Sequence, residues 1–221
     1  MNIEPESRVG EIAARYPLAT RVFARHRIDF CCGGGVALAE ACRKRDLDVS
    51  EVLVEIRRTL DTEAPETEPW NQAPIAELVR HIVDDYHGPL REELPRLEEM
   101  ARKVARVHGD KDPERLSALL ETFLALRSEL DEHLRHEESE LFPQLLAHGL
   151  SSDDLLSSLV EEHETAGRAL ERIRELTDDY RVPEQACNTW RALWHGLAAL
   201  EESLHRHIHL ENNILFRRVA A

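Results

Sequence analysis

The chain has 221 residues, with 43 aspartate and glutamate residues against 28 lysine and arginine residues and a formal net charge of −15. An acidic surface argues against nucleic acids and anionic membranes as partners, because both repel it. The sequence contains no run of about 18 apolar residues, so we expect no membrane-spanning helix. The first residues lack the pattern of a secretory signal.

Residues 1–60 are predicted to form a small helical domain. Apolar residues recur at helical spacing in three segments, 9–16, 19–25 and 52–60. A glycine-rich turn, Phe30-Cys31-Cys32-Gly33-Gly34-Gly35, leads into a further segment at 36–43. Residues 61–74 are acidic and contain prolines, and they bury little apolar surface. We therefore expect them to be a linker.

Residues 75–221 are predicted to form a four-helix bundle. Four long segments have helical periodicity: 75–107, 113–148, 153–177 and 184–218. The short connections between them, such as Gly149-Leu150-Ser151, imply antiparallel neighbours, and Ser152 is a candidate N-cap. The expected fold class is all-α with up-down-up-down topology. Pro89, Pro95 and Pro143 lie inside these segments and are expected to kink or interrupt the helices.

One short motif occurs in both the second and the fourth of these segments. It reads His133-x-x-x-Glu137 in one and His207-x-x-x-Glu211 in the other, and each copy is followed by Leu-Phe one turn later. Four residues advance an α-helix by about 40° and roughly 6 Å, so each histidine and its glutamate project from the same face. The apolar continuation marks that face as the buried one.

The first and third segments each supply one further histidine, His87 and His163. His87 and His133 each lie 20 residues from the connection between their helices, so an antiparallel pair places them at the same height. Four imidazoles and two carboxylates at one level predict a metal site. Two bridging glutamates, Glu137 and Glu211, with four terminal histidines match a binuclear non-haem iron centre.

Two other interpretations of these residues compete with a binuclear iron centre. Zinc is the main rival metal, but six ligands exceed its usual four-coordinate site. A single His-x-x-x-Glu pair is usually a surface pair or a packed core histidine, whereas two copies in register with two more histidines favour metal binding. Glu129 and Glu162 are candidates to orient an imidazole or relay protons. A solvated helix face is the simpler reading of both, and it is slightly favoured for Glu162.

The sequence contains four cysteines. They lack the spread of a disulfide framework, so we expect the reducing cytoplasm as the compartment. Cys31 and Cys32 precede three glycines and a helix, whose N-terminus would favour thiolate. We expect these two thiols to be exposed and to serve redox exchange, transient metal transfer or NO chemistry, rather than packing. Cys42 and Cys187 are expected to be packing residues.

Together these motifs resemble the RIC family (repair of iron centres), di-iron proteins that repair iron–sulfur clusters, over essentially the whole chain. Phe30-Cys31-Cys32-Gly33-Gly34 is similar to the family's small cysteine-bearing domain. The hemerythrin-like domain is matched by four motifs: Tyr86-His87, His133-x3-Glu137, Glu162-His163-Glu164 and His207-x3-Glu211-Asn212-Asn213. The resemblance implies terminal iron ligation by the four histidines, bridging by Glu137 and Glu211, and two non-haem irons per chain with an oxo or hydroxo bridge.

The function that the resemblance implies is repair of clusters damaged by nitric oxide or peroxide. The partners would be damaged iron–sulfur proteins and small ligands such as NO or O2, and a homodimer is compatible with the sequence. Iron donation and an NO-reducing or other oxidoreductase activity both stay open. The alternative is a hemerythrin-like carrier or sensor of O2 or NO, which leaves Cys31-Cys32 without a role. A carboxylate-rich oxidase or ferritin-like store ranks below both, and a purely structural bundle ranks last.

Overall fold

The structure, a computed structural model, describes residues 3–62, 70–148 and 153–219. Within these ranges the secondary structure is helical, and the only strand-like feature is an isolated antiparallel bridge between Arg8 and Ala37. The expected all-α class is thereby confirmed. No helix in the described part of the chain is both long and apolar enough to cross a membrane.

The chain divides into two compact units. The first comprises residues 1–79, 150–160 and 205–221, and the second comprises residues 80–149 and 161–204. Helices α5 (Ile75–Ile82), α9 (Asp153–Leu176) and α10 (Asn188–His209) contribute residues to both. The predicted division into 1–60, 61–74 and 75–221 stays a prediction. Residues 63–69 of the predicted linker lie outside the described ranges. The predicted break at 149–151 and the predicted cap Ser152 also lie outside them.

Four short helices build the N-terminal part of the first unit, and they follow the predicted segments closely. They are α1 (Val9–Arg15), α2 (Ala19–Arg25), α3 (Leu38–Arg43) and α4 (Val49–Thr62). Their apolar faces enclose one core that includes Val9, Phe23, Leu38 and Ile56, each fully buried. These helices are short, so packing against this shared core is the main source of their stability.

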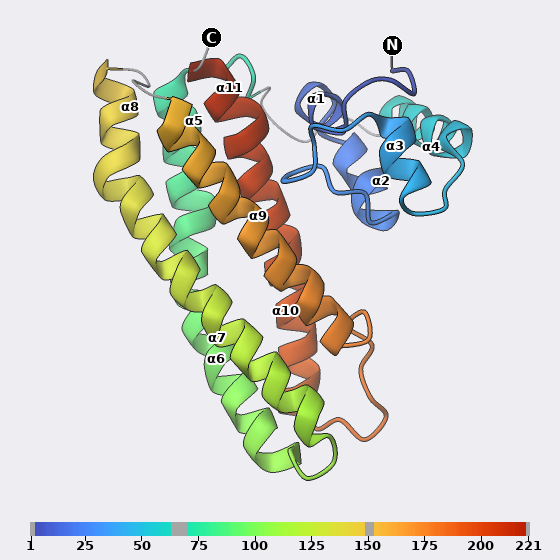
Figure 1. Cartoon of the computed structure of the whole chain (residues 1–221), viewed down its shortest axis with the longest axis vertical. Coiled ribbons are helices and arrows are strands. Elements are labelled where there is room, and N and C mark those ends of the chain that lie inside the picture. Colours follow the sequence, from blue (N-terminus) through green and yellow to red (C-terminus); the bar gives the residue numbers. More distant parts are fainter. Residues whose placement is uncertain (1–2, 63–69, 149–152, 220–221) are drawn as a thin grey trace. The chain divides into compact units, whose positions relative to one another are not determined.

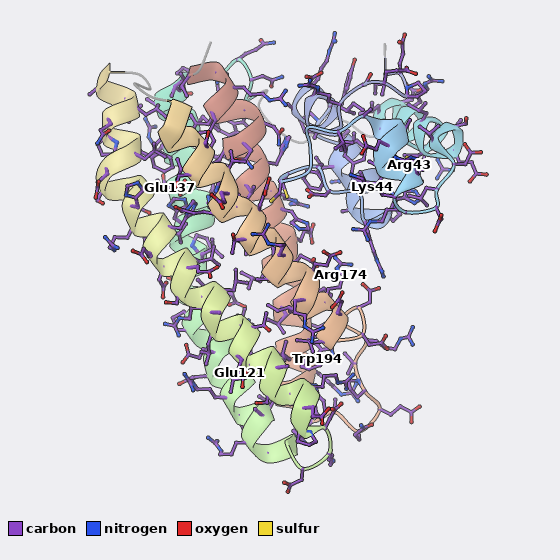
Figure 2. The ribbon with its side chains drawn as sticks, in the orientation of Figure 1. Arg43, Lys44, Glu121, Glu137, Arg174 and Trp194 are labelled. Atoms are coloured by element: carbon purple, nitrogen blue, oxygen red, sulfur yellow. The ribbon has the colours of Figure 1, made fainter. Side chains whose placement is uncertain are left out.

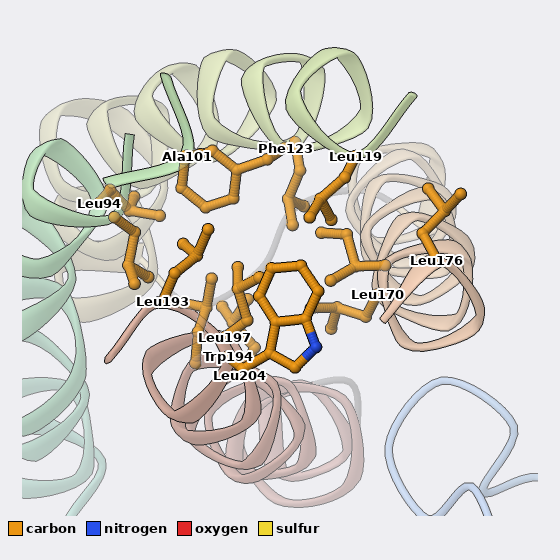
Figure 3. Close-up of a cluster of buried hydrophobic side chains, with 14 of the residues drawn as sticks. Leu94, Ala101, Leu119, Phe123, Leu170, Leu176, Leu193, Trp194, Leu197 and Leu204 are labelled. Atoms are coloured by element: carbon orange, nitrogen blue, oxygen red, sulfur yellow. The ribbon is translucent and has the colours of Figure 1, made fainter. Parts of the chain in front are cut away.

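The second unit is an antiparallel four-helix arrangement (Figure 1). Helix α6 (Gly88–His108) packs along α7 (Pro113–His136), and α9 and α10 complete the core. Figure 3 shows Phe123, Leu170 and Trp194 pointing inward from three different helices. The Trp194 indole N–H donates to the Thr177 carbonyl at 3.2 Å, so this large buried ring also has its polar atom paired.

The fourth predicted helix begins later than expected. Helix α10 starts at Asn188 rather than near residue 184. Asp178, Asp179 and Tyr180 have positive φ angles of 50°, 59° and 57°, and the Ala186 N–H donates to the Pro183 carbonyl at 3.0 Å. The chain therefore completes a turn before α10 starts.

Three short π-helical segments interrupt the long helices. They are η1 (Val83–His87), η2 (Glu137–Leu141) and η3 (Leu210–Leu215), followed by α6, α8 (Phe142–His148) and α11 (Phe216–Val219). Pro89 and Pro143 lie just after η1 and η2. A proline ring in an α-helix clashes with the carbonyl four residues earlier, and here that carbonyl lies in a wider π turn. Pro95, in contrast, leaves α6 continuous from Gly88 to His108.

Candidate metal centre

His87 ends the segment η1 and is fully buried. Its Nδ1 lies 2.7 Å from Glu138 Oε1, and its Nε2 lies 3.5 Å from Glu137 Oε2. An imidazole that donates from Nδ1 to a carboxylate presents the lone pair of Nε2 on the other side of the ring. The carboxylate of Glu138 therefore fixes the tautomer that suits metal ligation.

His133 on α7 and His163 on α9 meet at their Nε2 atoms, which are 3.0 Å apart. Both side chains are buried. His133 Nδ1 lies 2.7 Å from Glu162 Oε2, and its Nε2 lies 3.4 Å from Glu137 Oε1. The same arrangement as at His87 thus recurs, with a carboxylate behind the ring and the Nε2 lone pair in front.

His207 on α10 and Glu211 on η3 form the remaining pair. His207 Nε2 lies 3.0 Å from Glu211 Oε1, and both residues are buried. The two copies of the repeated motif therefore have the same local arrangement, because in each one the histidine Nε2 faces the carboxylate four residues later.

The donor atoms of these six residues fall into two groups of four. One comprises His87, Glu137, His207 and Glu211, and the other comprises His133, Glu137, His163 and Glu211. In each group the donor atoms all lie within 4.8 Å of one another, and every member is buried. Glu137 and Glu211 belong to both groups, so each group combines two imidazoles with the same two carboxylates.

Glu137 (labelled in Figure 2) provides a test of whether a cation fits. Its side chain is fully buried, and neither carboxylate oxygen has a hydrogen-bond partner. Its carboxylate oxygens lie 3.4 Å from His133 Nε2 and 3.5 Å from His87 Nε2. A buried carboxylate without hydrogen bonds is costly. A cation between these donors would compensate that charge, so the residues present fit a metal.

The π-helical segments lie at the proposed ligands. His87 ends η1, Glu137 begins η2, and Glu211 is the second residue of η3. A π turn holds one residue more than an α turn and is frequent at functional sites. The predicted spacing assumed regular α-helix, whereas the structure has a wider turn beginning at or next to each glutamate.

The carboxylates behind the histidines were only partly anticipated. Glu162 contacts His133 at 2.7 Å, which favours the orienting role over the predicted solvated helix face. Glu129 is exposed on α7, and its role stays a prediction. Glu138 was missed, although a second glutamate directly after the proposed ligand Glu137 was an available signal. Burial would raise the pKa of Glu138, but hydrogen bonds from His87 and Arg91 outweigh burial and hold that pKa below its usual value.

The Cys31-Cys32 turn differs from what the sequence predicted. Cys31 is 3% exposed and Cys32 is half-buried, so three following glycines do not make this turn fully exposed. Helix α3 begins only at Leu38, too far on to favour thiolate. The Cys31 pKa is instead raised well above its ordinary value, by its hydrogen bond with Cys32, by burial and by the nearby Asp29 carboxylate.

Asn213 connects the cysteine turn to η3 within the first unit. Its Nδ2 donates to the carbonyls of Phe30 and Cys31 at 3.1 and 3.3 Å, and it lies 3.2 Å from His209 Nδ1. Burial lowers the pKa of His209 to about 4, against a hydrogen bond with the Phe30 backbone that raises it. His209 is therefore neutral at pH 7 and its Nδ1 can accept the Asn213 amide.

The other cysteines and His108 are placed as follows. Cys42 is buried in the core of the first unit, as expected of a packing residue. Cys187 is exposed, so its assignment as a packing residue is wrong. It precedes α10 in the turn-forming segment, and its Sγ lies 3.3 Å from His108 Nε2. His108 itself is buried at the end of α6, with its ring 4.8 Å from that of Trp190.

Comparison with known families agrees with this architecture. The model of the hemerythrin HHE cation binding domain matches residues 78–219. A second model, described as a domain of unknown function (DUF542), matches residues 5–59. The fold and the buried histidine and glutamate donors therefore define a hemerythrin-like cation-binding protein with an additional N-terminal domain.

Similar proteins are known from several bacteria. The chain is 39% identical to the iron–sulfur cluster repair protein YtfE of Pectobacterium atrosepticum, over 95% of each chain. It is 41% identical to the protein of that name from Musicola paradisiaca, over 96% of each chain, and 40% identical to that of Yersinia pseudotuberculosis, over 95% of each. The chain belongs to this family of iron–sulfur cluster repair proteins, which confirms the resemblance stated from the sequence.

Proposed function

We propose that this protein helps to repair iron–sulfur clusters damaged by nitric oxide or peroxide, and that it does so with a binuclear non-haem iron centre. The observation that carries the proposal is the pair of donor groups that share Glu137 and Glu211. Two groups with common carboxylates suit two ions bridged by those carboxylates. The relatives are named as iron–sulfur cluster repair proteins, and this supports the repair role. The two donor groups give that role a chemical basis.

In this proposal His87 and His207 are the terminal ligands of one iron, and His133 and His163 are those of the other. Imidazole and carboxylate donors suit iron, and two imidazoles with two bridging carboxylates leave positions open at each ion. Such a centre, when bound, supplies one-electron redox chemistry and open sites for small ligands such as NO or O2.

The surrounding residues have two tasks in this proposal. Glu138 and Glu162 accept hydrogen bonds from the Nδ1 atoms of His87 and His133, and they hold those rings with Nε2 toward the donor group. The apolar core of the second unit keeps bulk water from the buried donors, which strengthens the interaction of carboxylates with cations.

Metal analysis of substituted proteins tests the ligand assignment. We expect about two irons per wild-type chain, since six ligands with two bridging carboxylates fit a binuclear centre. Glu137→Ala should lower the iron content more than His87→Ala, because Glu137 belongs to both donor groups. His136→Ala is the matched control, since the half-buried His136 directly precedes Glu137, belongs to neither donor group and pairs with Glu140 at 3.8 Å. Equal losses in all three variants, or one tightly bound zinc without iron, would contradict the assignment.

The repair role is tested with an iron–sulfur dehydratase inactivated by NO or peroxide. The iron-loaded protein with a reductant should restore activity, and replacing His87 and His163 together should abolish the effect through loss of metal. Replacing Cys31 and Cys32 by serine should weaken repair and leave the iron content unchanged. The control is free ferrous iron at equal concentration with the same reductant.

The second candidate function is binding of O2 or NO as a carrier or sensor, which the match to the hemerythrin domain favours. It leads if free ferrous iron restores the dehydratase as well as the protein does, and if cells lacking the gene are no more sensitive to NO. The proposal also includes damaged iron–sulfur proteins as partners, a cytoplasmic location and a homodimer. Repair would proceed either by iron donation or by NO reduction.

A further inference from the structure

A second cluster of metal-ligating side chains lies in the cysteine turn, apart from the six donors described above. Asp29, Cys31 and Cys32 each offer a donor atom, and these atoms lie within 4.8 Å of one another. Cys31 Sγ is 3.6 Å from Cys32 Sγ and 3.3 Å from Asp29 Oδ1. We propose that these three residues form a second cation site, which takes one thiophilic divalent ion of the Fe²⁺ and Zn²⁺ class.

The distances fit a tetrahedral ion. With metal–sulfur bonds of about 2.3 Å and metal–oxygen bonds of about 2.1 Å, tetrahedral angles separate two sulfurs by about 3.8 Å and a sulfur and an oxygen by about 3.6 Å. The observed separations of 3.6 and 3.3 Å differ from these by a few tenths of an ångström. Side-chain adjustment alone can close that difference.

A disulfide is a poor alternative for this pair. Consecutive Cα atoms are about 3.8 Å apart across a trans peptide, whereas disulfide-bonded cysteines usually have Cα atoms about 4.4–6.8 Å apart. Joining Cys31 to Cys32 would therefore strain the intervening backbone. Coordination needs no such strain, because each sulfur keeps its own bond to the ion. No electron is transferred, and each thiol that becomes a ligand releases its proton to solvent.

The backbone already holds the three donors in place. Asp29 Oδ1 accepts the N–H groups of Cys31 and Cys32 at 2.9 and 3.0 Å, and Asp29 Oδ2 accepts that of Gly33 at 2.7 Å. Asn213, on η3, donates hydrogen bonds to the carbonyls of Phe30 and Cys31. The turn is thus anchored at both its carboxylate and its carbonyl groups, and little ordering remains to be done when an ion binds.

The site is also open to exchange. Cys31 is buried, Cys32 is half-buried, and Asp29 is exposed to solvent. Three protein ligands leave a fourth position for water or an incoming ligand, as in sites that are not purely structural. A cation held here can therefore be passed on to a partner. This inference does not rest on the binuclear centre, since none of its residues belongs to the two buried groups.

Cobalt binding to the full-length protein tests the inference. Co²⁺ is added without oxygen to protein already loaded with iron, and thiolate coordination is read from the near-ultraviolet charge-transfer absorption. Wild type should saturate at one Co²⁺ per chain, and Cys31→Ser or Cys32→Ser should remove the absorption. Asp29→Asn keeps one oxygen acceptor for the turn, and we expect it to weaken binding by at least about tenfold.

The matched control is Cys187→Ser, which removes an exposed thiol elsewhere and should leave the absorption intact. Iron content and far-ultraviolet circular dichroism of the same samples report separately on the binuclear centre and on folding. The half-buried Cys32 is the safer position for serine if the Cys31 variant does not fold. Absorption that is missing from wild type, that survives Cys32→Ser, or that disappears in Cys187→Ser overturns the proposal, whatever the iron content shows.

Discussion

The carboxylate behind His87 provides a quantitative test of how the proposed metal centre is supported. Glu138 Oε1 lies 2.7 Å from His87 Nδ1 and 2.5 Å from an Arg91 guanidinium nitrogen, and its side chain is 27% exposed. Glu138→Gln keeps the shape and an accepting oxygen but removes the charge. The change therefore removes the charge of the ion pair with Arg91 together with the charge-assisted part of the hydrogen bond to His87. Of these two contacts, the one to His87 orients the proposed ligand.

The size of the effect follows from that hydrogen bond. Hydrogen bonds to charged groups contribute about 1.5–3 kcal/mol and neutral ones about 1 kcal/mol. The loss of about 0.5–2 kcal/mol corresponds to about two- to thirtyfold weaker iron binding. Glu162→Gln should have a smaller effect, because the Glu162 side chain is 49% exposed and solvent screens its charge.

The assay is the rate and extent of iron loss to a chelator, followed in parallel for each variant. Glu140→Gln is the matched control, since Glu140 lies in the same π segment, its side chain is 59% exposed, and it pairs with His136 at 3.8 Å rather than with a proposed ligand. Iron retention by Glu138→Gln equal to that of wild type would refute the orienting role. Equal iron loss from Glu140→Gln would show that net charge, rather than the hydrogen bond, is responsible.

Two further predictions concern the first unit. A Cβ at Gly10 would lie 2.2 Å from Asn213 Oδ1, so Gly10→Ala should lower the free energy of unfolding by about 1–3 kcal/mol. A Cβ at Gly35 would have no atom within 4 Å, so Gly35→Ala should leave that free energy unchanged. Chemical denaturation measures both variants, and equal effects would contradict the packing argument. The pKa of Glu55 is lowered chiefly by its hydrogen bond with His26. The charged carboxylate therefore stabilises the fold at pH values above the unfolded pKa of about 4.3. This stabilisation is lost as the pH falls through the lower pKa of the folded state. Glu55→Gln should therefore be less stable than wild type at pH 7 and converge with it in acid, and a constant gap across that range would refute the assignment.

Most of the helices and the choice of candidate ligands follow from local sequence patterns. Helix bounds such as Ala19–Arg25 follow from local periodicity, which the chain carries wherever one face of a helix is buried. The repeated His-x-x-x-Glu motif likewise places each histidine beside its glutamate, because four residues bring two side chains to one face whatever surrounds the helix.

Other features depend on residues far apart in the chain, and only the packing of the helices reveals them. The π turns were not predicted, because hydropathy spacing does not register one extra residue in a turn. The burial of Cys31 depends on surrounding packing, and the turn's link to Asn213 spans more than 180 residues. Glu138 was missed for the same reason, since its partner His87 is on another helix, 51 residues away. Local periodicity tells which face of a helix is buried, but only the packed chain determines which polar groups meet there.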